Sequence, residues 1–439
     1  MMERNTIFAL SSGPPPAGVA VIRLSGPKTR FGLETLIDSI PEPRRATLRS
    51  VRFRGTEIDR ALIIYMPGPA SFSGEDMAEL HIHGGRAVIA ALLDALGTLS
   101  GFRAAESGEF TRRAFLNGRL DLTEVEGMAD LIAAETEAQR RQALRQADGT
   151  LRKAAESWRE RLVRARALIE AELDFADEED VPGAVSDRIW PDVSNLAEEI
   201  SVALAGADPA ERLRDGAEIV ILGPPNAGKS TLLNALARRE VAIVTPEPGT
   251  TRDLIEVRLD IGGYPVTLVD TAGLRDAAGA VEAEGVRRAE KRAASADFVL
   301  WLGEAGSPLP APPVAAPILR VGTKTDALDS SPQRALRRAD FDVLISARTG
   351  EGLDSLLARL GDFLRERFAP AESSLITRAR HRSCLIACRD AAIAAGRPGP
   401  LELRAEELRR ATDALGRLVG AVDVDDMLDV IFREFCIGK

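Results

Sequence analysis

The segment GPPNAGKST, residues 223–231, lies between the apolar run EIVIL and the helix-forming run LLNALARR. It matches the pattern G-x-x-x-x-G-K-S in the strand–loop–helix context that phosphate binding needs. Gly223 and Gly228 allow the tight backbone turn that points N–H groups and a helix N-terminus at phosphate oxygens. Lys229 is expected to reach the β- and γ-phosphates, and Ser230 to offer its hydroxyl to Mg2+. An ordinary glycine-rich turn is the alternative, and the flanking strand and helix patterns argue against it.

Two later segments extend this candidate site toward magnesium and the γ-phosphate. VTLVDTAG, residues 266–273, ends an apolar run in Asp270, a carboxylate suited to hold Mg2+ through water. In the same segment, Gly273 can approach the γ-phosphate. TPEPGTTRD, residues 245–253, supplies Thr251 as a second hydroxyl ligand of Mg2+. The three segments together predict a nucleoside triphosphate bound with Mg2+.

Two further strand ends predict which base is bound. VGTKTD and VLISAR each end a predicted strand, where Asp326 can accept from the N1 and N2 protons of guanine. Ser346 and Ala347 can support the O6 atom of the same base. Adenine lacks both donors, so GTP is favoured over ATP. The residues expected at the nucleotide are Asn226, Ala227, Gly228, Lys229, Ser230, Thr231, Thr245, Pro246, Glu247, Pro248, Gly249, Thr250, Thr251, Asp270, Thr271, Ala272, Gly273, Thr323, Lys324, Asp326, Ser346 and Ala347.

The five segments, in this order, resemble the GTPase superfamily. One position departs from its pattern, because the usual N-K-x-D is T-K-T-D here, beginning at Thr323. Threonine keeps a hydroxyl but lacks the amide of asparagine. We therefore expect looser recognition of the base at Thr323, with Asp326 as the main selector of guanine.

The group that orients the attacking water is not given by the motif that follows Asp270. Leu274 stands where Ras-like proteins place a glutamine, and an apolar side chain cannot orient water. The polar segment 275–290 holds Glu282 and Glu284, and either could serve as a catalytic carboxylate. A solvated helix is the alternative for this segment, and the spacing alone favours it.

The composition excludes several classes of protein. The chain has 439 residues, of which 45% are apolar and 28% charged, as is typical of soluble multidomain proteins. No apolar run reaches the roughly 18 residues that cross a bilayer, and the three cysteines suggest no disulfide framework. We therefore expect a cytoplasmic protein with no membrane association. The net charge of −10 argues against indiscriminate nucleic-acid binding but allows a local basic surface.

Four stretches of different pattern predict a multidomain architecture. Residues 1–118 have short strand patterns cut by Gly and Pro, which indicate an α+β domain. Residues 119–212 and 373–439 carry long 3.6-residue periods, which indicate helices. Residues 213–372 alternate apolar strands with helices, which indicates an α/β domain with a doubly wound parallel sheet. An α-helical domain that carries the α/β domain as an insertion accounts for this order.

Two pairs of residues are weaker candidates for metal binding. His81 and His83 lie two apart on a strand pattern and share a face with Glu79, either as metal ligands or as a polar strand face. Cys384 and Cys388 are spaced i, i+4 on a helix pattern, where packing and metal binding both fit. The polar strand face and the packed cysteines are the favoured interpretations.

The chain as a whole resembles the MnmE (TrmE) family of tRNA modification GTPases. The resemblance extends over essentially the full length. Its N-terminal segments and its ending are particular to this family, whereas the GTPase motifs are shared with others. Besides those motifs, the segments that carry it are GVAVIRLSG, MPGPASFSGEDMAELHIHGG, GEFTRRAFLNGRLDL, DTAGLRDAAGAVEAEG and the terminal FCIGK.

The resemblance implies a K+-stimulated GTPase that acts with the FAD-dependent partner MnmG (GidA) in a hetero-oligomer, FAD being held only by that partner. Together they would add a carboxymethylaminomethyl- or aminomethyl-type group to C5 of the wobble uridine of certain tRNAs. It also implies a homodimer joined by the N-terminal domains, which would bind a 5-formyltetrahydrofolate-type one-carbon donor. A GTP-switched ribosome-maturation or assembly factor is the alternative, and the GTPase motifs alone do not exclude it.

The resemblance also implies how GTP would be hydrolysed. GTPase domains would pair across their nucleotide faces and use K+ where other GTPases use an arginine. Asn226 would bind K+ through its side chain, and the backbone around Thr245, Glu247 and Thr250 would complete the site. Glu282 would orient the attacking water.

For the one-carbon donor, the family's binding positions match Arg23, Glu79, Arg119 and Lys439. Arg119 stands where Lys is common, and the two cations differ in geometry. Cys436 lies in the terminal CIGK, which has the frame of a prenylation box but ends in a residue that prenylation disfavours. A packed cysteine at a helix end and a thiol that assists one-carbon chemistry are the remaining alternatives.

A basic stretch is the candidate surface for tRNA. Residues 138–168 carry nine Arg or Lys against two Glu and one Asp. Basic helices can contact tRNA phosphates, but arginines on helices are also ordinary solvated surface. If the stretch binds RNA, tRNA binding should weaken when Arg140, Arg141 and Arg145 are neutralised together.

Overall fold

The structure is a computed structural model, and its chain forms two compact units. One unit comprises residues 1–129, 146–186 and 399–439, and the other comprises residues 130–145 and 187–398. Among the described residues, no helix combines the length and apolarity that a membrane span needs. The structure describes residues 5–174, 189–239, 241–243, 255–270, 292–309, 316–328, 340–368, 374–422, 431–432, 435 and 438.

The first unit begins with a six-stranded sheet whose spatial order is β3-β4-β5-β2-β1-β6. Neighbouring strands are antiparallel except β1 and β6, which run parallel. This sheet is the one predicted for the N-terminal α+β domain. Its strands are β1 (Thr6–Leu10), β2 (Ala17–Ser25), β3 (Thr47–Phe53), β4 (Thr56–Met66), β5 (Met77–Gly84) and β6 (Phe102–Ala104).

Two helices, α1 (Thr29–Leu36) and α2 (Arg86–Gly97), cover one face of this sheet. Leu33 and Leu92 pack there against strand residues such as Leu80, and all three are fully buried. Because side chains alternate across a strand, the other face carries the intervening residues. These include exposed apolar side chains and the charged residues discussed below.

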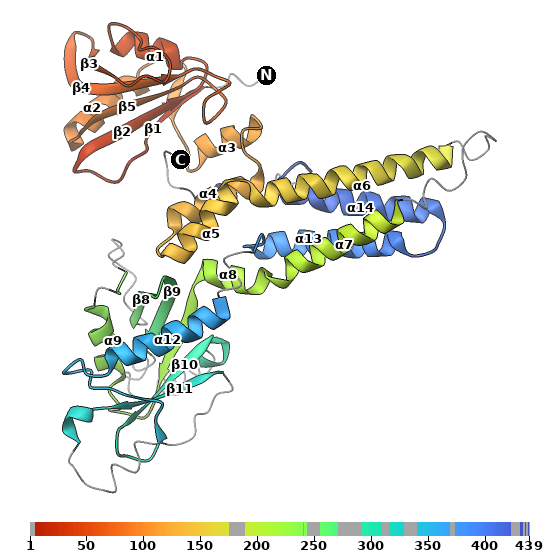
Figure 1. Ribbon diagram of the computed structural model, residues 1–439. Helices are drawn as coiled ribbons and strands as arrows, with labels where there is room; N and C mark the ends of the chain where they lie inside the picture. Colours follow the sequence, from red (N-terminus) through yellow and green to blue (C-terminus); the bar gives the residue numbers. More distant parts are fainter. Residues whose placement is uncertain are drawn as a thin grey trace, which may run out of the picture. The chain divides into compact units, whose positions relative to one another are not determined.

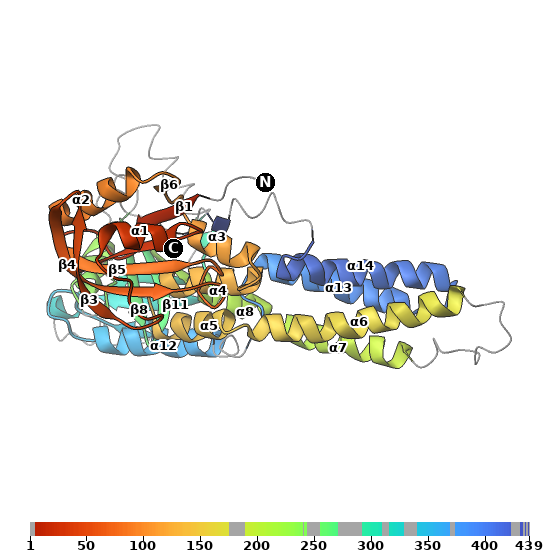
Figure 2. The ribbon, with the colours of Figure 1, turned by 90° about the horizontal axis from the view of Figure 1, so that it is seen from above.

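The rest of the first unit is helical and includes a piece of the C-terminus. Its helices are α3 (Glu109–Leu116), α4 (Leu122–Ala133), α6 (Thr150–Asp174) and α14 (Leu401–Val419). Helices α6 and α14 lie side by side (Figures 1 and 2). Phe432 and Phe435 pack in a cluster with Leu122 at the start of α4. The Ser11 hydroxyl donates to the Gly438 carbonyl at 2.7 Å, so the described end of the chain lies against the N-terminal sheet domain.

The second unit is built on a sheet of order β12-β11-β10-β7-β9-β8. All neighbours are parallel except the edge strand β8, which is antiparallel to β9. The predicted doubly wound α/β fold is therefore confirmed, with one antiparallel edge strand, which is common in such sheets. The strands are β7 (Ala217–Leu222), β8 (Ile255–Ile261), β9 (Tyr264–Asp270), β10 (Phe298–Glu304), β11 (Ile318–Thr323) and β12 (Val343–Leu344).

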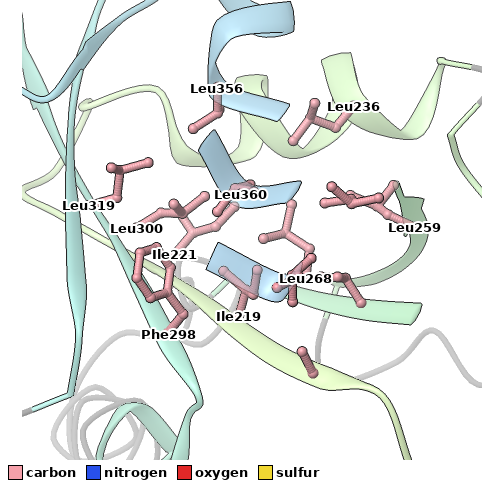
Figure 3. Packing of buried hydrophobic residues seen from close by; sticks show 14 of the residues in the cluster. Ile219, Ile221, Leu236, Leu259, Leu268, Phe298, Leu300, Leu319, Leu356 and Leu360 are labelled. Atoms are coloured by element: carbon pink, nitrogen blue, oxygen red, sulfur yellow. The ribbon is translucent and has the colours of Figure 1, made fainter. Parts of the chain in front are cut away.

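Both faces of this second sheet are buried. On one face, Ile219 and Leu300 pack against Leu236 of α9 (Lys229–Ala237) and Leu360 of α12 (Leu353–Phe368), as Figure 3 shows. On the other, Val220 packs with neighbouring strand residues and Ala293. Strands buried on two faces cannot alternate polar and apolar residues, which explains continuous runs such as EIVIL.

The remaining helices of this unit include a packed pair, α7 and α13, and two helices that contact the sheet domain, α5 and α8. Helices α7 and α13 pack together, and α5 packs on the tip of the β8–β9 hairpin, where the Ala138 N–H donates to the Gly263 carbonyl at 3.2 Å. Asp130 accepts from Arg214 at 2.8 Å and from Arg378 at 2.7 Å, which joins three segments of the unit. The bounds are α5 (Glu137–Ala147), α7 (Trp190–Ala205), α8 (Ala207–Asp215), the short 3-10 helix η3 (Thr325–Ala327) and α13 (Ala379–Gly396).

Candidate functional site

The predicted phosphate loop connects β7 to the N-terminus of α9. Gly223 has φ +152°, and a Cβ there would lie 2.3 Å from the Leu302 carbonyl oxygen. Gly228 has φ +89° and is the N-cap of α9. Both positions require glycine, the first for lack of space and the second for its left-handed backbone. The loop thus brings backbone N–H groups to a helix N-terminus, which favours bound anions.

The lysine and serine of this loop lie where the carboxyl ends of the parallel strands meet. Lys229 is buried, and its ammonium donates to the carbonyls of Gly223 at 3.1 Å and Pro224 at 3.0 Å. The Ser230 hydroxyl donates to Asp270 at 2.6 Å, and Asp270 is fully buried at the end of β9. The structure therefore brings together two of the oxygen groups that the sequence suggested for Mg2+, a hard cation that prefers oxygen ligands.

The residues predicted to select the base lie at the ends of β11 and β12. The Ser346 hydroxyl donates to one oxygen of Asp326 at 2.6 Å, and Arg348 pairs with the other at 2.7 Å. The Ser346 hydrogen bond is the main cause that lowers the pKa of Asp326 below its usual value, with Arg348 adding to it. The Asp326 carboxylate is thus ionised near neutral pH and able to accept from donors of a base.

Thr323 and Lys324 complete the same edge of the sheet. Thr323 is 2% exposed, and its hydroxyl lies 2.8 Å from the Ala227 carbonyl oxygen of the phosphate loop. Lys324 adopts a left-handed φ of +58° and pairs with Glu304 at 3.4 Å. At the position that departs from the N-K-x-D pattern, a buried threonine is therefore hydrogen-bonded to the backbone of the phosphate loop.

The remaining predicted nucleotide residues divide into two groups. Asn226, with φ +61°, and Thr231 are exposed around the loop, and Ala347 is partly buried beside Ser346. The others lie outside the described residues, together with the predicted catalytic residue Glu282. They are Thr245, Pro246, Glu247, Pro248, Gly249, Thr250, Thr251, Thr271, Ala272 and Gly273.

A second polar site lies on the N-terminal sheet, where Arg23 of β2 stands opposite Glu79 of β5. The Arg23 guanidinium donates to Glu79 Oε1 from Nε at 3.1 Å and from Nη2 at 2.9 Å. His81 contacts the other oxygen of Glu79 at 3.3 Å. The rings of Phe72 and Phe110 lie 5.9 and 5.7 Å from the guanidinium carbon. Two predicted one-carbon residues are therefore paired in an environment that is partly aromatic.

The other residues predicted for the one-carbon donor are only partly described. Arg119 is exposed in the turn after α3. A Cβ added to Gly74 would lie 3.3 Å from the Cγ of Arg119, so these two residues are close neighbours. No contact joins Arg119 to the Arg23–Glu79 pair within the described part of the chain. Cys436 and Lys439 lie outside the described residues, although Gly438 is placed on the N-terminal sheet domain by its bond to Ser11.

The weaker metal candidates have other partners. His83 contacts Asp59 at 2.8 Å, and His81 contacts Glu79. Among the described residues, no three His, Cys, Asp or Glu side chains lie close enough to hold a metal ion. Cys388 is buried, and burial raises the pKa of its thiol to about 12, with Cys384 adding to the shift. A thiol with so high a pKa is a poor ligand, which supports the packing interpretation.

The sequence interpretation missed three residues that the structure adds to these sites. Arg348 contacts Asp326, and Phe72 and Phe110 flank Arg23. Arg348 directly follows the predicted Ser346-Ala347 pair, so its position in VLISAR was a usable signal. The two phenylalanines lie 38 residues apart in the chain, and no local pattern joins them to the β2 strand.

The phosphate loop, the Ser230–Asp270 pair and the Asp326 carboxylate, all at one edge of a doubly wound sheet, define the class of P-loop GTPases. Solved structures to which the chain is similar include Era of Aquifex aeolicus, at 24% identity, TM-score 0.28, and coverage of 42% of this chain and 69% of that one. The G domain of the FeoB iron transporter of T. maritima is similar at 22% identity and TM-score 0.25, covering 34% of this chain and 98% of that one.

Family comparisons identify the chain more closely. A family model described as GTP-binding protein TrmE N-terminus matches residues 6–119, and one described as MnmE helical domain matches residues 122–436. Proteins named tRNA modification GTPase MnmE are 54% identical in Mesorhizobium japonicum and 53% identical in Sinorhizobium medicae, each aligned over 100% of both chains. The chain belongs to the MnmE family of tRNA modification GTPases, so the predicted family and enzyme class are confirmed.

Proposed function

We propose that this chain binds and hydrolyses GTP with Mg2+, and that this turnover supports modification of C5 of the wobble uridine in certain tRNAs. In this proposal the chain acts with the FAD-dependent partner MnmG (GidA), which together with it adds a carboxymethylaminomethyl- or aminomethyl-type group. The observation that carries the proposal is the end-to-end similarity to proteins named tRNA modification GTPase MnmE. The GTP step is supported independently by the residues at the edge of the second sheet.

The chain's own residues account for binding of the triphosphate. Lys229 can exchange its two loop carbonyl partners for phosphate oxygens, which are stronger acceptors because they are charged. Ser230 and Asp270 offer oxygen atoms 2.6 Å apart, and Thr251 is the further hydroxyl proposed for Mg2+. Bound Mg2+ would neutralise charge that develops on the phosphates. Asp326, held ionised by Ser346 and Arg348, would accept from the guanine N1 and N2 protons.

We further propose that K+ stimulates hydrolysis through Asn226, Thr245, Glu247 and Thr250, and that Glu282 orients the attacking water. Asn226 is exposed, so its side chain is accessible to a K+ ion bound at the nucleotide face. The test compares GTP hydrolysis in KCl and NaCl at equal ionic strength. Equal rates would overturn the role of K+ while leaving GTP binding intact. Glu282→Ala should slow hydrolysis but retain GTP binding, whereas Glu284→Ala serves as the neighbouring control.

The N-terminal sheet domain is the proposed site of the 5-formyltetrahydrofolate-type one-carbon donor, through Arg23, Glu79, Arg119 and Lys439. The Arg23–Glu79 pair supports this because its aromatic neighbours can contact a flat ring system while the charged groups bind polar edges. Titration of the full chain with 5-formyltetrahydrofolate should give saturable binding that Arg23→Ala weakens. Cys436→Ser should reduce tRNA modification and spare GTP turnover, and full modification by that variant would remove the proposed thiol.

A homodimer joined by the N-terminal domains fits the sheet face that α1 and α2 leave uncovered. Leu48 stands opposite Leu62, and Leu62 opposite His81, in one row across three strands. Leu48 is 61% exposed and Leu62 is 45% exposed. The two leucines form an exposed apolar pair on this sheet face, and exposed apolar patches mark interaction surfaces. Leu62→Asp should lower the sedimentation coefficient to that of a monomer; an unchanged dimer would contradict the proposed interface.

The decisive experiment combines the purified chain with its flavin partner, GTP, the one-carbon donor and unmodified tRNA. Nucleoside analysis should show the modified wobble uridine only when GTP can be hydrolysed. The alternative, an assembly factor switched by GTP, predicts GTP turnover with no new nucleoside. Unmodified uridine in the complete mixture, with active GTPase, would therefore favour that alternative.

A further inference from the structure

Thr323, at the carboxyl end of β11, occupies a position where its hydroxyl contacts two other segments of the sheet edge. Its Oγ1 lies 2.8 Å from the Ala227 carbonyl oxygen and 3.2 Å from the Gly303 carbonyl oxygen. A hydroxyl has a single proton to donate, and here both nearby acceptors are main-chain carbonyls. The side chain is 2% exposed, so no solvent competes for that proton.

The carbonyl that receives the shorter bond belongs to the phosphate loop itself. Ala227 is 2% exposed and precedes Gly228, whose left-handed φ of +89° begins helix α9. A Cβ on Gly228 would lie 3.8 Å from the Thr323 hydroxyl, so the loop and the threonine are in close packing contact. The hydroxyl bond therefore fixes the loop residue that positions the helix N-terminus.

We propose that Thr323 is a positioning residue that anchors the phosphate loop and, because its only proton is used there, cannot donate to the N7 atom of the base, so that Asp326 is the main selector of guanine. An asparagine amide has two protons and could bind the Ala227 carbonyl while donating to a second acceptor such as the purine N7. The threonine hydroxyl has no second proton for N7. This inference rests on the proposed binding of GTP and names how that same site discriminates among nucleotides.

The first test uses the unaltered full-length chain and three nucleotides. GTP and 7-deaza-GTP, which lacks the N7 acceptor, should bind with affinities that agree within about twofold, because no bond to N7 is lost. Inosine triphosphate lacks the 2-amino group and should bind about tenfold more weakly, since one donor to Asp326 is missing. Calorimetric titration with Mg2+ present measures all three.

The outcomes separate this inference from the function on which it rests. If GTP itself gives no binding, the proposed GTPase function fails. If GTP binds but 7-deaza-GTP binds more than about fivefold less tightly, Thr323 does recognise N7 in some way and the inference is overturned alone.

Three variants sharpen the test. Thr323→Asn supplies the second proton and should create a preference of roughly tenfold for GTP over 7-deaza-GTP. Thr323→Val keeps the shape but removes the hydroxyl, so it should weaken GTP and 7-deaza-GTP by the same factor, and Thr323→Ser should recover most of that loss. If Thr323 acted in folding alone, Thr323→Asn would alter the melting temperature without altering the ratio of the affinities for GTP and 7-deaza-GTP. An unchanged ratio in a folded Thr323→Asn chain that binds GTP would contradict the inference.

Discussion

The two sheets of this chain differ in where their functional side chains lie: on a face of the N-terminal sheet, and at an edge of the GTPase sheet. In the N-terminal sheet, strand β5 alternates buried and partly exposed residues, and the second group includes Glu79 and His81. In the GTPase sheet, strand β10 is buried at six successive positions, Phe298 to Gly303. The first sheet therefore offers a partly open face for chemistry, whereas both faces of the second are buried and only its edge is available.

The difference follows from how each sheet is covered. Antiparallel strands can leave one face to solvent, so charged residues such as Arg23 can lie in the middle of a strand. Parallel strands joined by helices are buried on both faces, and polar groups then collect where the strands end. Asp270 ends β9 and Thr323 ends β11, and both are buried. Sites in this chain are therefore found on the face of one sheet and at the carboxyl edge of the other.

The largest expected effect comes from placing a charge at a buried position of the GTPase sheet. The same change at an exposed position of the N-terminal sheet serves as the comparison. Val220 of β7 is fully buried, and Val220→Asp should destabilise the GTPase sheet by more than about 4 kcal/mol, because an isolated carboxylate would lose its water. Val19 of β2 is 56% exposed, and Val19→Asp should change the free energy of unfolding by less than about 0.5 kcal/mol. Hydrogen exchange measured by mass spectrometry can follow each sheet separately. Similar losses in the two variants would contradict the comparison.

A somewhat smaller effect is expected from removing one cation at each site. Lys229→Ala should reduce GTP turnover by roughly 100- to 1,000-fold, since it deletes a buried positive charge aimed at the phosphate loop. Arg23→Ala should leave GTP turnover within about twofold while weakening the one-carbon donor, because it lies on the other sheet. Steady-state GTPase assays of both variants check this. A large loss of GTPase activity in Arg23→Ala would show that the two sheets do not work independently.

The third prediction compares two carboxylates, one from each unit. Ser346 and Arg348 lower the pKa of Asp326, whereas burial raises the pKa of Asp121 at the start of α4 to about 6. The bonds from the Glu124 N–H at 2.8 Å and the Thr123 hydroxyl at 2.9 Å both go to the same oxygen of Asp121. Its other oxygen has no hydrogen-bond partner among the described residues. The folded chain therefore favours protonated Asp121 relative to the unfolded chain.

The sign of the resulting pH dependence follows from that shift. The stabilisation is complete below the ordinary value of 3.8 and is lost as pH rises through about 6. The free energy of unfolding of the first unit should thus fall by up to roughly 3 kcal/mol between those values. Asp121→Asn keeps a good helix cap but cannot titrate, so its stability should vary less over this range. Urea denaturation of both chains at several pH values measures the difference. If the free energy of unfolding depended on pH equally in the two chains, the raised pKa of Asp121 would be contradicted.

The sequence predicted the sheet class and the position of the nucleotide edge because both follow from local patterns. Apolar runs such as EIVIL and the spacing of GPPNAGKST need only neighbours in the chain. It could not predict contacts between distant segments. The Thr323 bond to Ala227 spans 96 positions, and the contact of Arg378 with Asp130 spans 248. The domain boundaries after residues 118, 212 and 372 stay predictions.

The predicted basic surface is also altered by contacts that the sequence pattern did not reveal. Arg140 and Arg141 both pair with Glu137, at 2.7 and 2.9 Å, near the start of α5. The two arginines lower the pKa of Glu137 to about 2, so the carboxylate stays charged at neutral pH. One negative charge therefore offsets part of the surface that tRNA would contact.

The smallest expected effect is on tRNA affinity and follows from that pairing. Neutralising Arg140, Arg141 and Arg145 together as glutamines should weaken tRNA binding by about 3- to 10-fold at low salt and make the affinity less dependent on salt concentration. Glu137→Gln is the matched control, because it removes the competing carboxylate and leaves all three arginines, so it should strengthen binding. GTP turnover should not change in either variant, since α5 carries none of the nucleotide residues. If Glu137→Gln and the triple variant bind tRNA equally well, this helix is solvated surface and the RNA contact lies elsewhere.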